Sequence, residues 1–390
     1  GRVSRTAGTI FFIISRILAS AVRLAGCAIA VSVFFDLNLT TAIILIALFA
    51  MAYTTTGGIK AVIWTDMLQL GLFLVGAGIT IIYIWSALPR GFEQFVEIGQ
   101  LHEKFTTFNF ALNLNDATTF WAGNFFAVVI GLAVGATDQD IAQRLLTCRK
   151  TGEAQKAAIA YGAASLFTTL IFLTVGAALF AYYTTFPDAG MEGLRNDQIF
   201  PYFIRHVLSP GMRGLLVAAL LAAAMSSLDS ALNGLASTAY ADLYLPFVRK
   251  GKADKKSVQT SRVFVVAFGV ILAAVAMNFG SKPSILWFGL RIMGYTYGAL
   301  LGIFLLAVLT KRRGAEWTNV AAMATSVIVV LFLTAGLGEG ALASMRSTLL
   351  SPLGVDQIAW PWAIVIGTAW TFGVASIWPT DGRGRPRGSG

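Results

Sequence analysis

The sequence predicts an all-α membrane protein, and three observations support that class. Hydrophobic residues make up 56% of the 390 residues and charged residues only 12%, whereas a soluble domain carries about 25% charged residues. The mean hydropathy is +0.72. Apolar segments long enough to cross about 30 Å of hydrocarbon as helices recur along the chain, without the two-residue alternation of membrane strands.

These apolar segments predict about ten transmembrane helices in a single membrane domain that spans residues 1–378. We expect the spans near 9–35, 39–56, 62–86, 119–137, 157–184, 213–240, 258–279, 284–309, 317–335 and 360–378. The basic, low-complexity segment 379–390 is predicted to be a disordered cytoplasmic tail.

Three of the connecting segments are long enough to have structure of their own. Residues 89–118 are polar and mixed, and 139–156 are predicted to include a helix whose basic residues face lipid headgroups. Residues 193–207 are predicted to form a short amphipathic helix over the bundle, although Pro201 weakens its middle. An ordinary surface role and a gating role both remain open for that helix.

The net charge of +10 does not indicate a nucleic-acid-binding protein, because the basic residues alternate between loops instead of collecting in one soluble domain. Lys and Arg cluster at 2–5, 144–156, 249–256, 311–313 and 383–387, whereas acidic residues cluster at 93–116, 188–197 and 339–356. By the positive-inside rule the basic loops are cytoplasmic. An even number of spans then places both ends of this chain on the cytoplasmic side of the plasma (or inner) membrane.

The residues that most enzyme chemistry needs are sparse in this chain. Cys27 and Cys148 have no metal-ligand companions, and His102 and His206 lie far apart in sequence. The sequence indicates no zinc site and no redox chemistry. It also indicates no nucleophile–base set for covalent catalysis. The sequence therefore favours a protein that is not an enzyme.

One polar stretch, 222–233, interrupts an otherwise apolar helix. Ala223 and three serines are spaced i, i+3, i+4 and i+7, so they share one stripe of the helix, and an aspartate lies at its edge. The polar members are Ser226, Ser227, Asp229 and Ser230. Such a surface of oxygen atoms suits a small hard cation, and polar groups inside a membrane are costly unless they serve a function.

A second carboxylate, Asp66, lies about one turn into the third predicted span, after a Gly57–Gly58 turn. It has two interpretations: an acid stabilised by the helix N-terminus, or a carboxylate on the exit path of a cation. Acidic residues also end the fourth span, in the run TDQD at 137–140. Loop solvation accounts for that run.

Three segments together resemble the sodium/solute symporter family: GGIKAVIWTDMLQ at 57–69, TDQDIAQRLL at 137–146 and AAAMSSLDSALNG at 222–234. Residues 298–306 resemble a late-helix pattern of the same family. The resemblance extends over essentially the whole chain. It implies the leucine-transporter-type fold, with two inverted repeats of five helices, and solute uptake coupled to sodium by alternating access.

The resemblance also implies roles for individual residues. Ala223, Ser226 and Ser227 match one half of the family's sodium site, and backbone carbonyls of the first core helix supply the other half. By the same comparison this chain, which does not begin with Met, starts at the third core helix. We therefore expect it to lack the first two core helices, and as it stands not to transport.

A second cation site is implied by the family members that bind two sodium ions. Its residues match Ser226, Asp229, Ser230 and Asp66, with an aspartate at 229 where those members have serine. A carboxylate there would hold a cation more strongly, or would bind a proton instead. Sodium and proton coupling therefore both remain open.

Three intramembrane arginines are the only indication of the solute. Arg16 and Arg23 are seven residues apart on one face of the first span, and Arg291 lies about two turns into the eighth. Guanidinium groups at such depth should pair or face water. They either hold the carboxylate of an anionic solute, or they pair with aspartates in the bundle or extend their charged ends to the membrane interface.

The sequence therefore predicts sodium-coupled symport of a small organic solute in the lipid bilayer, with Na+ as the coupling ion and no nucleic-acid partner. A symporter-like membrane sensor and a proton-coupled transporter are the alternatives.

Gly294, Gly298 and Gly302 recur every four residues on the eighth span, a pattern typical of close helix packing.

Overall fold

The computed structural model is almost entirely helical. It describes residues 1–56, 59–105, 108–138, 141, 145, 147–250, 252, 256–280, 282, 284–310, 313–336, 341–377 and 379–380. Its long helices are α1 (Arg2–Phe35), α2 (Leu39–Thr56), α3 (Ile59–Ala87), α5 (Phe120–Thr137), α7 (Thr151–Thr185), α9 (Pro210–Thr238), α10 (Ser257–Phe279), α11 (Ile285–Leu309), α12 (Glu316–Leu333) and α14 (Trp362–Ile377).

Shorter elements connect these helices. They are α4 (Gly91–Leu101), η1 (Ala189–Met191), α8 (Asn196–His206), the π-helix η2 (Ala239–Val248) that continues α9, α13 (Ala341–Leu350) and η3 (Ser351–Leu353). The two-residue strands β1 (Arg313–Gly314) and β2 (Pro379–Thr380) pair in antiparallel fashion.

Each of the ten predicted spans coincides with one of the long helices. Within the described residues, eight of these helices are long and apolar enough to cross a membrane. The remaining two, α2 and α14, are apolar but shorter. The all-α class and the membrane-spanning architecture are thus confirmed.

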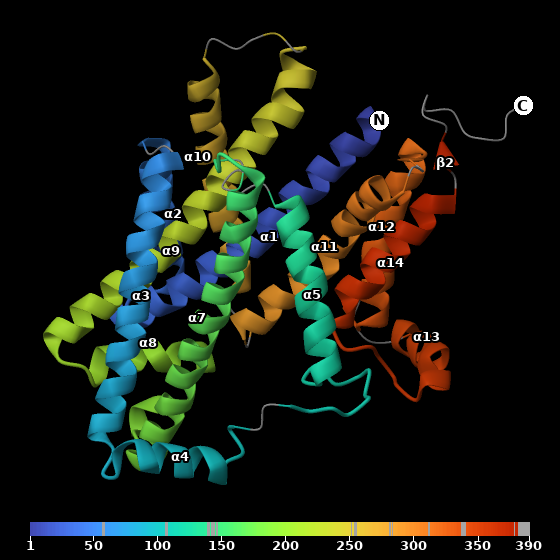
Figure 1. Cartoon of the computed structure of the whole chain (residues 1–390). Helices are drawn as coiled ribbons and strands as arrows, with labels where there is room; N and C mark the ends of the chain where they lie inside the picture. Colours follow the sequence, from blue (N-terminus) through green and yellow to red (C-terminus); the bar gives the residue numbers. More distant parts are fainter. Residues whose placement is uncertain are drawn as a thin grey trace, which may run out of the picture.

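Helix α1 is the structural centre of the molecule. It runs diagonally between a group formed by α2, α3, α7, α9 and α10 and a group formed by α5, α11, α12 and α14 (Figure 1). It packs against α2, α8, α9, α10, α11 and α12. Its small side chains Ala21, Ala25 and Ala28 are fully buried, so neighbouring helices can approach closely on several sides.

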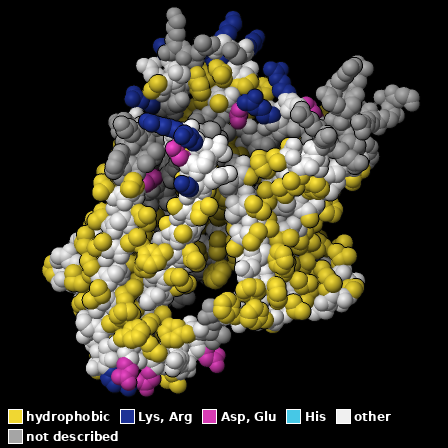
Figure 2. Space-filling model, in the orientation of Figure 1, with side chains coloured by type: hydrophobic (Ala, Val, Ile, Leu, Met, Phe, Trp, Pro, Cys, Tyr) yellow, Lys and Arg dark blue, Asp and Glu magenta, His cyan; other side chains and the backbone are white. Residues whose placement is uncertain are grey.

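The outer faces of the helices remain apolar where they are exposed. Ile159, Leu166 and Leu173 of α7 are each exposed by more than 60%, and Figure 2 shows hydrophobic side chains over the flanks of the bundle. Lys and Arg gather at the end that carries the α9–α10 connection, here called the basic end (Figure 2). The opposite end, which carries α4 and α8, is called the acidic end.

Helix α8 confirms the predicted short helix at 193–207, and Pro201 lies inside it. Two charged residues at its start bind the ends of neighbouring helices. Arg195 donates to the Gly280 carbonyl at the end of α10 at 2.7 Å, and Asp197 accepts the Ile285 N–H at the start of α11 at 3.1 Å. Both charges have the sign that stabilises the helix dipole they face.

Two more arginines near the acidic end donate hydrogen bonds to backbone carbonyls. Arg205 of α8 donates to the Val33 carbonyl in the last turn of α1 at 2.7 Å. Arg346 of α13 donates to the Asp356 carbonyl at 3.1 Å and to the Phe332 carbonyl of α12 at 3.5 Å. Val33 and Phe332 lie in the last turns of α1 and α12, where backbone carbonyls lack the i+4 donor of a continuing helix.

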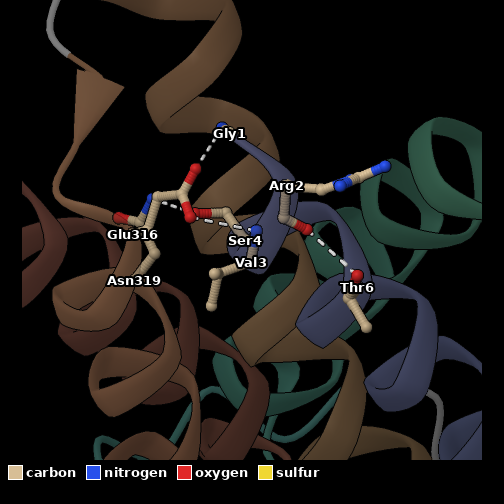
Figure 3. Close-up of polar contacts among 7 residues, drawn as sticks. All are labelled: Gly1, Arg2, Val3, Ser4, Thr6, Glu316 and Asn319. Atoms are coloured by element: carbon tan, nitrogen blue, oxygen red, sulfur yellow. Dashed lines mark hydrogen bonds and ion pairs between the residues drawn. The ribbon is translucent and has the colours of Figure 1, made fainter. Parts of the chain in front are cut away.

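At the basic end, the start of α1 contacts the start of α12 (Figure 3). Glu316 accepts a hydrogen bond from the Val3 backbone N–H, and Asn319 donates to the Ser4 hydroxyl, both at 3.0 Å. These contacts fix the first turn of the described α1 against the second helical group.

Two findings about the connections were not expected from the sequence. Residues 89–118 contain helix α4, which the mixed polarity of the segment did not reveal. Helix α7 begins at Thr151, so the end of the predicted 139–156 segment belongs to a span. Residues 381–390 of the predicted tail, Gly57–Gly58 and most of 139–146 lie outside the described residues.

The glycine stripe of α11 lies directly against α14, as its spacing predicted. A Cβ added at Gly302 would lie 2.6 Å from Thr371 Cβ and 2.8 Å from the Thr368 carbonyl oxygen. At Gly131 of α5 an added Cβ would meet nothing within 4 Å. The first position therefore requires glycine for packing, and the second does not.

Replacing Gly302 with alanine should lower the free energy of unfolding by about 1–3 kcal/mol, because the methyl group overpacks the α11–α14 contact. The measurement is the Tm of the purified protein in detergent. Gly131→Ala is the control, and it should be neutral or slightly stabilising, since alanine favours helix by about 0.5–1 kcal/mol. Equal effects of the two substitutions would contradict the packing assignment.

Candidate functional site

The polar stretch of α9 lies inside the bundle, where α9 packs against α1, α2, α3 and α10. Ala223, Ser226, Ser227 and Ser230 are half-buried, and Asp229 is only 2% exposed. The carboxylate is therefore removed from bulk water, and the serine stripe is partly shielded from it. A buried carboxylate requires a partner of opposite charge or hydrogen-bond donors.

Asp66 meets this stretch from α3, two turns after that helix begins. The Ser226 hydroxyl donates a hydrogen bond to the Asp66 carboxylate. Two residues that the sequence analysis selected, 160 positions apart, thus lie side by side. The contact joins α3 to α9 at the level of the candidate cation site.

The sequence analysis missed one member of this group, Thr54 of α2. Its hydroxyl donates to the Asp229 carboxylate, and its side chain is 5% exposed. Its position in a run of three threonines just before the Gly57–Gly58 turn was the available signal, but nothing in the local sequence identifies a partner 175 residues away.

Together these side chains present carboxylate and hydroxyl oxygens from three helices. Such oxygens are the ligands of hard cations, and sodium needs no thiolate or imidazole. No cluster of three or more His, Cys, Asp or Glu side chains occurs within the described residues. The side chains of the site offer only hard oxygen donors, which suit alkali and alkaline-earth ions.

A second polar group lies between α1, α5 and α11. Arg16 of α1 forms an ion pair with Asp138, the residue that ends α5, at 2.7 Å, and their side chains are 5% and 4% exposed. The Tyr297 hydroxyl of α11 is 3.5 Å from the same Asp138 oxygen. Asp138 was assigned only to loop solvation at the sequence level, and that interpretation is wrong, because the side chain is buried.

Arg23 is seven residues from Arg16 on the same face of α1, but its surroundings differ. It is exposed, although the adjacent Val22 and Leu24 are buried. Within the part of the chain that the structure describes, its guanidinium group has no hydrogen bond or ion pair. Figure 2 shows that the molecule is hollowed between α5 and α7, in front of α1 (Figure 1).

The third intramembrane arginine, Arg291, lies on a different side of α11. Gly294 and Gly298 face α14, and Arg291 falls on their stripe because it precedes them by three and seven residues. Gly289, in contrast, contacts Val22 of α1. The structure therefore brings Arg16 and Arg23 together and does not bring Arg291 to them.

The chain is similar to a known family of membrane proteins. The model of the sodium:solute symporter family matches residues 2–328. The sodium/sialic acid symporter NanT of Aliivibrio fischeri is 29% identical over 84% of this chain, and SiaT of Proteus mirabilis is 28% identical over the same share. Sodium-coupled monocarboxylate transporter 2 of Danio rerio is 27% identical over 87% of it.

A solved structure shares the fold. A Na+-coupled sialic acid symporter in a substrate-bound, outward-open state aligns over 96% of this chain and 73% of its own, with a TM-score of 0.79 and 24% identity. The chain spans 65% and 66% of the lengths of the two sialic acid symporters, and 54% of the Danio rerio transporter.

Replacing Thr54 with valine, which keeps the shape but removes the hydroxyl, should lower the free energy of unfolding by about 1–3 kcal/mol. The buried Asp229 carboxylate then loses a donor. The matched control is Thr55→Val, because within the described residues the Thr55 hydroxyl donates only to the Ala52 carbonyl of its own helix. Thermal unfolding in detergent measures both, and equal Tm values would count against the Thr54 contact.

Proposed function

The chain belongs to the sodium:solute symporter family, and from that premise we propose that it carries out sodium-coupled symport of a small organic acid by alternating access. The observation that carries the proposal is the buried oxygen cluster that joins α2, α3 and α9. It supplies cation ligands at the position where the family resemblance implies a sodium site.

In this proposal Ala223, Ser226 and Ser227 hold the coupling sodium ion, the alanine through its backbone carbonyl. Asp66, Asp229 and Ser230 form a second cation site or the exit path toward the basic end. The hydrogen bond between Ser226 and Asp66 supports a path that the ion follows from one site to the other. The Ser226 hydroxyl is a proposed ligand of the coupling ion and also contacts Asp66.

Sodium and solute are coupled through the conformation that both prefer. If sodium stabilises the outward-open state, the solute binds more tightly to the sodium-loaded protein, and the reverse holds by linkage. Ion and solute are the cargo, so the mechanism requires binding and closure but no covalent chemistry. The protein is accordingly proposed to be a transporter and not an enzyme.

The solute is proposed to be an acid that Arg23 contacts through its carboxylate. A guanidinium group inside a membrane span is costly unless it pairs or faces water, and an acid would provide the pairing bidentately. The relatives carry the names of a sialic acid symporter and a monocarboxylate transporter, which supports an acidic solute. Arg16 is less suited, because Asp138 already binds it, and Arg291 is less suited because it lies on the side of α11 away from Val22 of α1.

The orientation in the membrane is part of the proposal. The basic end faces the cytoplasm, the acidic end with α4 and α8 faces outward, and residues 1–378 form the membrane domain in the plasma or inner membrane. The apolar flanks (Figure 2) contact lipid. Residues 379–390 extend as a basic cytoplasmic tail.

Proton coupling on the same fold is a second candidate, and the burial of Asp229 favours it. A carboxylate that is 2% exposed can hold a proton in place of a sodium ion. A sodium gradient and a pH gradient imposed separately on the same proteoliposomes distinguish the two. Uptake that follows only the pH gradient would assign the coupling to Asp229 and Asp66.

The combined substitution Ser226→Ala and Ser227→Ala in the full-length protein should raise the sodium concentration for half-maximal uptake by about tenfold or more, since tenfold corresponds to about 1.4 kcal/mol of lost binding. Uptake of labelled acids, sugars and amino acids into proteoliposomes measures it. The control is Ser237→Ala on the same helix, because Ser237 bonds the Gly234 carbonyl of its own helix at 3.1 Å.

An unchanged sodium requirement in the double variant, with normal expression, would remove the sodium assignment of the α9 stripe. Uptake of no solute by the wild-type protein under any gradient would instead favour a membrane sensor.

Asp66→Asn should lower the maximal rate of uptake several-fold and change the solute KM much less, because the carboxylate serves ion release and not solute contact. Initial rates at saturating sodium separate the two parameters. Asp36→Asn provides the control, since that side chain is 85% exposed at the acidic end. An unaltered maximal rate would argue against an exit path through Asp66.

A further inference from the structure

A large cavity lies beside α7, and none of the described residues that line it was assigned to ion or solute binding. Its volume is about 1290 Å³, and its walls come from the end of α3, from α4 and the residues after it, from α7 and from the start of α8. Helix α4 lies across the ends of α3 and α7 at the acidic end (Figure 1). Sites for drug-sized ligands measure about 300–1000 Å³, so this cavity has room for a molecule larger than a small organic acid.

The lining of the cavity changes from apolar to polar along α7. The residues of α7 that line it extend from Leu170 to Thr184, a length of about 21 Å at about 1.5 Å per residue. Leu170 and Leu173 lie toward the middle of the span, and Tyr183 lies near the acidic end. One leaflet of a bilayer contributes about 15 Å of hydrocarbon, which is half of the total thickness. The cavity is therefore long enough for one acyl chain together with the start of its headgroup.

Several polar groups at the acidic end of the cavity are donors without acceptors. The Trp85 Nε1 and Tyr183 Oη atoms are buried and have no hydrogen-bond partner within the described chain. The Lys104 ammonium lies 4.3 Å from the centre of the Phe180 ring, and no carboxylate among the described residues forms an ion pair with it. The Thr184 hydroxyl, in contrast, donates to the Phe180 carbonyl of its own helix at 2.8 Å. Because a buried donor without a partner is costly, these groups indicate a ligand that supplies acceptor oxygens.

We propose that this cavity binds one phospholipid with an anionic headgroup, taken from the leaflet at the acidic end. The phosphate lies at Lys104 and accepts hydrogen bonds from Trp85 and Tyr183, and one acyl chain extends along α7 toward Leu170. Lysine binds phosphate as a point charge, and tryptophan and tyrosine are enriched at the headgroup level of membranes. A zwitterionic headgroup would bring its own cation next to Lys104, so the anionic headgroup is favoured. Binding of this lipid does not depend on which ion or solute the protein carries.

The cavity is continuous with the apolar flank of the bundle. Leu170 and Leu173 line it and are 54% and 64% exposed, and Phe92 does so near the acidic end and is 56% exposed. Hydrophobic side chains cover this flank in Figure 2. A lipid can therefore enter sideways from the bilayer without separating the helices. A sugar in the same place would leave most of its hydroxyl groups unpaired against apolar walls, which is unfavourable.

The test measures lipid binding to the purified full-length protein in detergent by native mass spectrometry. The probes are dioleoylphosphatidylglycerol, which is anionic, and dioleoylphosphatidylcholine, which is zwitterionic and has the same acyl chains. The wild-type protein should bind one phosphatidylglycerol molecule with a Kd at least tenfold lower than that for phosphatidylcholine. Equal Kd values for the two lipids would overturn the inference.

Lys104→Gln should raise the Kd for phosphatidylglycerol about tenfold and change the Kd for phosphatidylcholine much less, because it removes only the cation at the headgroup. The matched control is Lys282→Gln. Lys282 also lies over a phenylalanine ring, 5.6 Å from the centre of Phe288, but it is not among the residues that line the cavity. Equal Kd values for phosphatidylglycerol in these two variants would contradict the role of Lys104 and overturn the inference.

Gly176→Leu tests the cavity itself and not the charge. Gly176 lines the cavity, and a Cβ added there would meet nothing within 4 Å. The leucine side chain should therefore occupy space that the acyl chain needs, and it should raise the Kd of both lipids by tenfold or more. Gly162→Leu on the same helix is the control, since an added Cβ also meets nothing within 4 Å there. Unchanged lipid binding by folded Gly176→Leu protein would overturn the inference.

A phosphatidylglycerol analogue with a photoreactive diazirine in one acyl chain identifies the occupant of the cavity. After irradiation in vesicles that contain the full-length protein, peptide mapping should find the label within residues 170–184 of α7. Gly176→Leu should remove this label, and Gly162→Leu should retain it. Absence of label from 170–184 in the wild-type protein would overturn the inference, and a cross-link from this stretch to a segment that precedes Gly1 would show that the protein itself fills the cavity.

Discussion

The architecture depends on how the polar side chains of α1 are accommodated in an apolar interior. The helix packs against six others, so its face toward them has little access to water. Ser15 bonds the Phe11 carbonyl within α1 at 2.7 Å, but a guanidinium group cannot be satisfied within its own helix. Arg16 instead determines which segment lies opposite, because breaking a buried ion pair typically costs about 3–5 kcal/mol.

The two polar groups of the bundle are connected by tightly packed apolar side chains. Leu24 and Ile29 of α1 and Leu228 and Leu232 of α9 belong to one buried cluster. Close-packed interiors transmit displacement instead of absorbing it. A cation on the serine stripe and an acid at Arg23 would therefore act on the same packed unit of α1 and α9.

Composition and hydrophobic runs were sufficient to predict the helices, because membrane spans need length and apolarity more than specific partners. Local spacing was also sufficient for the serine stripe of α9, and Asp66 was selected from its position near the start of a predicted span; the family resemblance then grouped it with Ser226. Thr54 and Asp138 could not be assigned, since their roles arise from partners 175 and 122 residues away. Helix α4 was missed because interfacial helices have weak apolar runs.

The sequence separation of the Arg16–Asp138 pair has a consequence for biosynthesis. The partners are 122 residues apart, and a ribosome adds roughly 5–20 residues each second, so Asp138 is made about 6–24 s after Arg16. During that interval the nascent α1 must be inserted before its carboxylate partner exists. The translocon, or water and headgroups reached by the long side chain, has to shelter the charge until α5 has been made, so the Arg16–Asp138 pair forms only after α2, α3 and α4 have been synthesised.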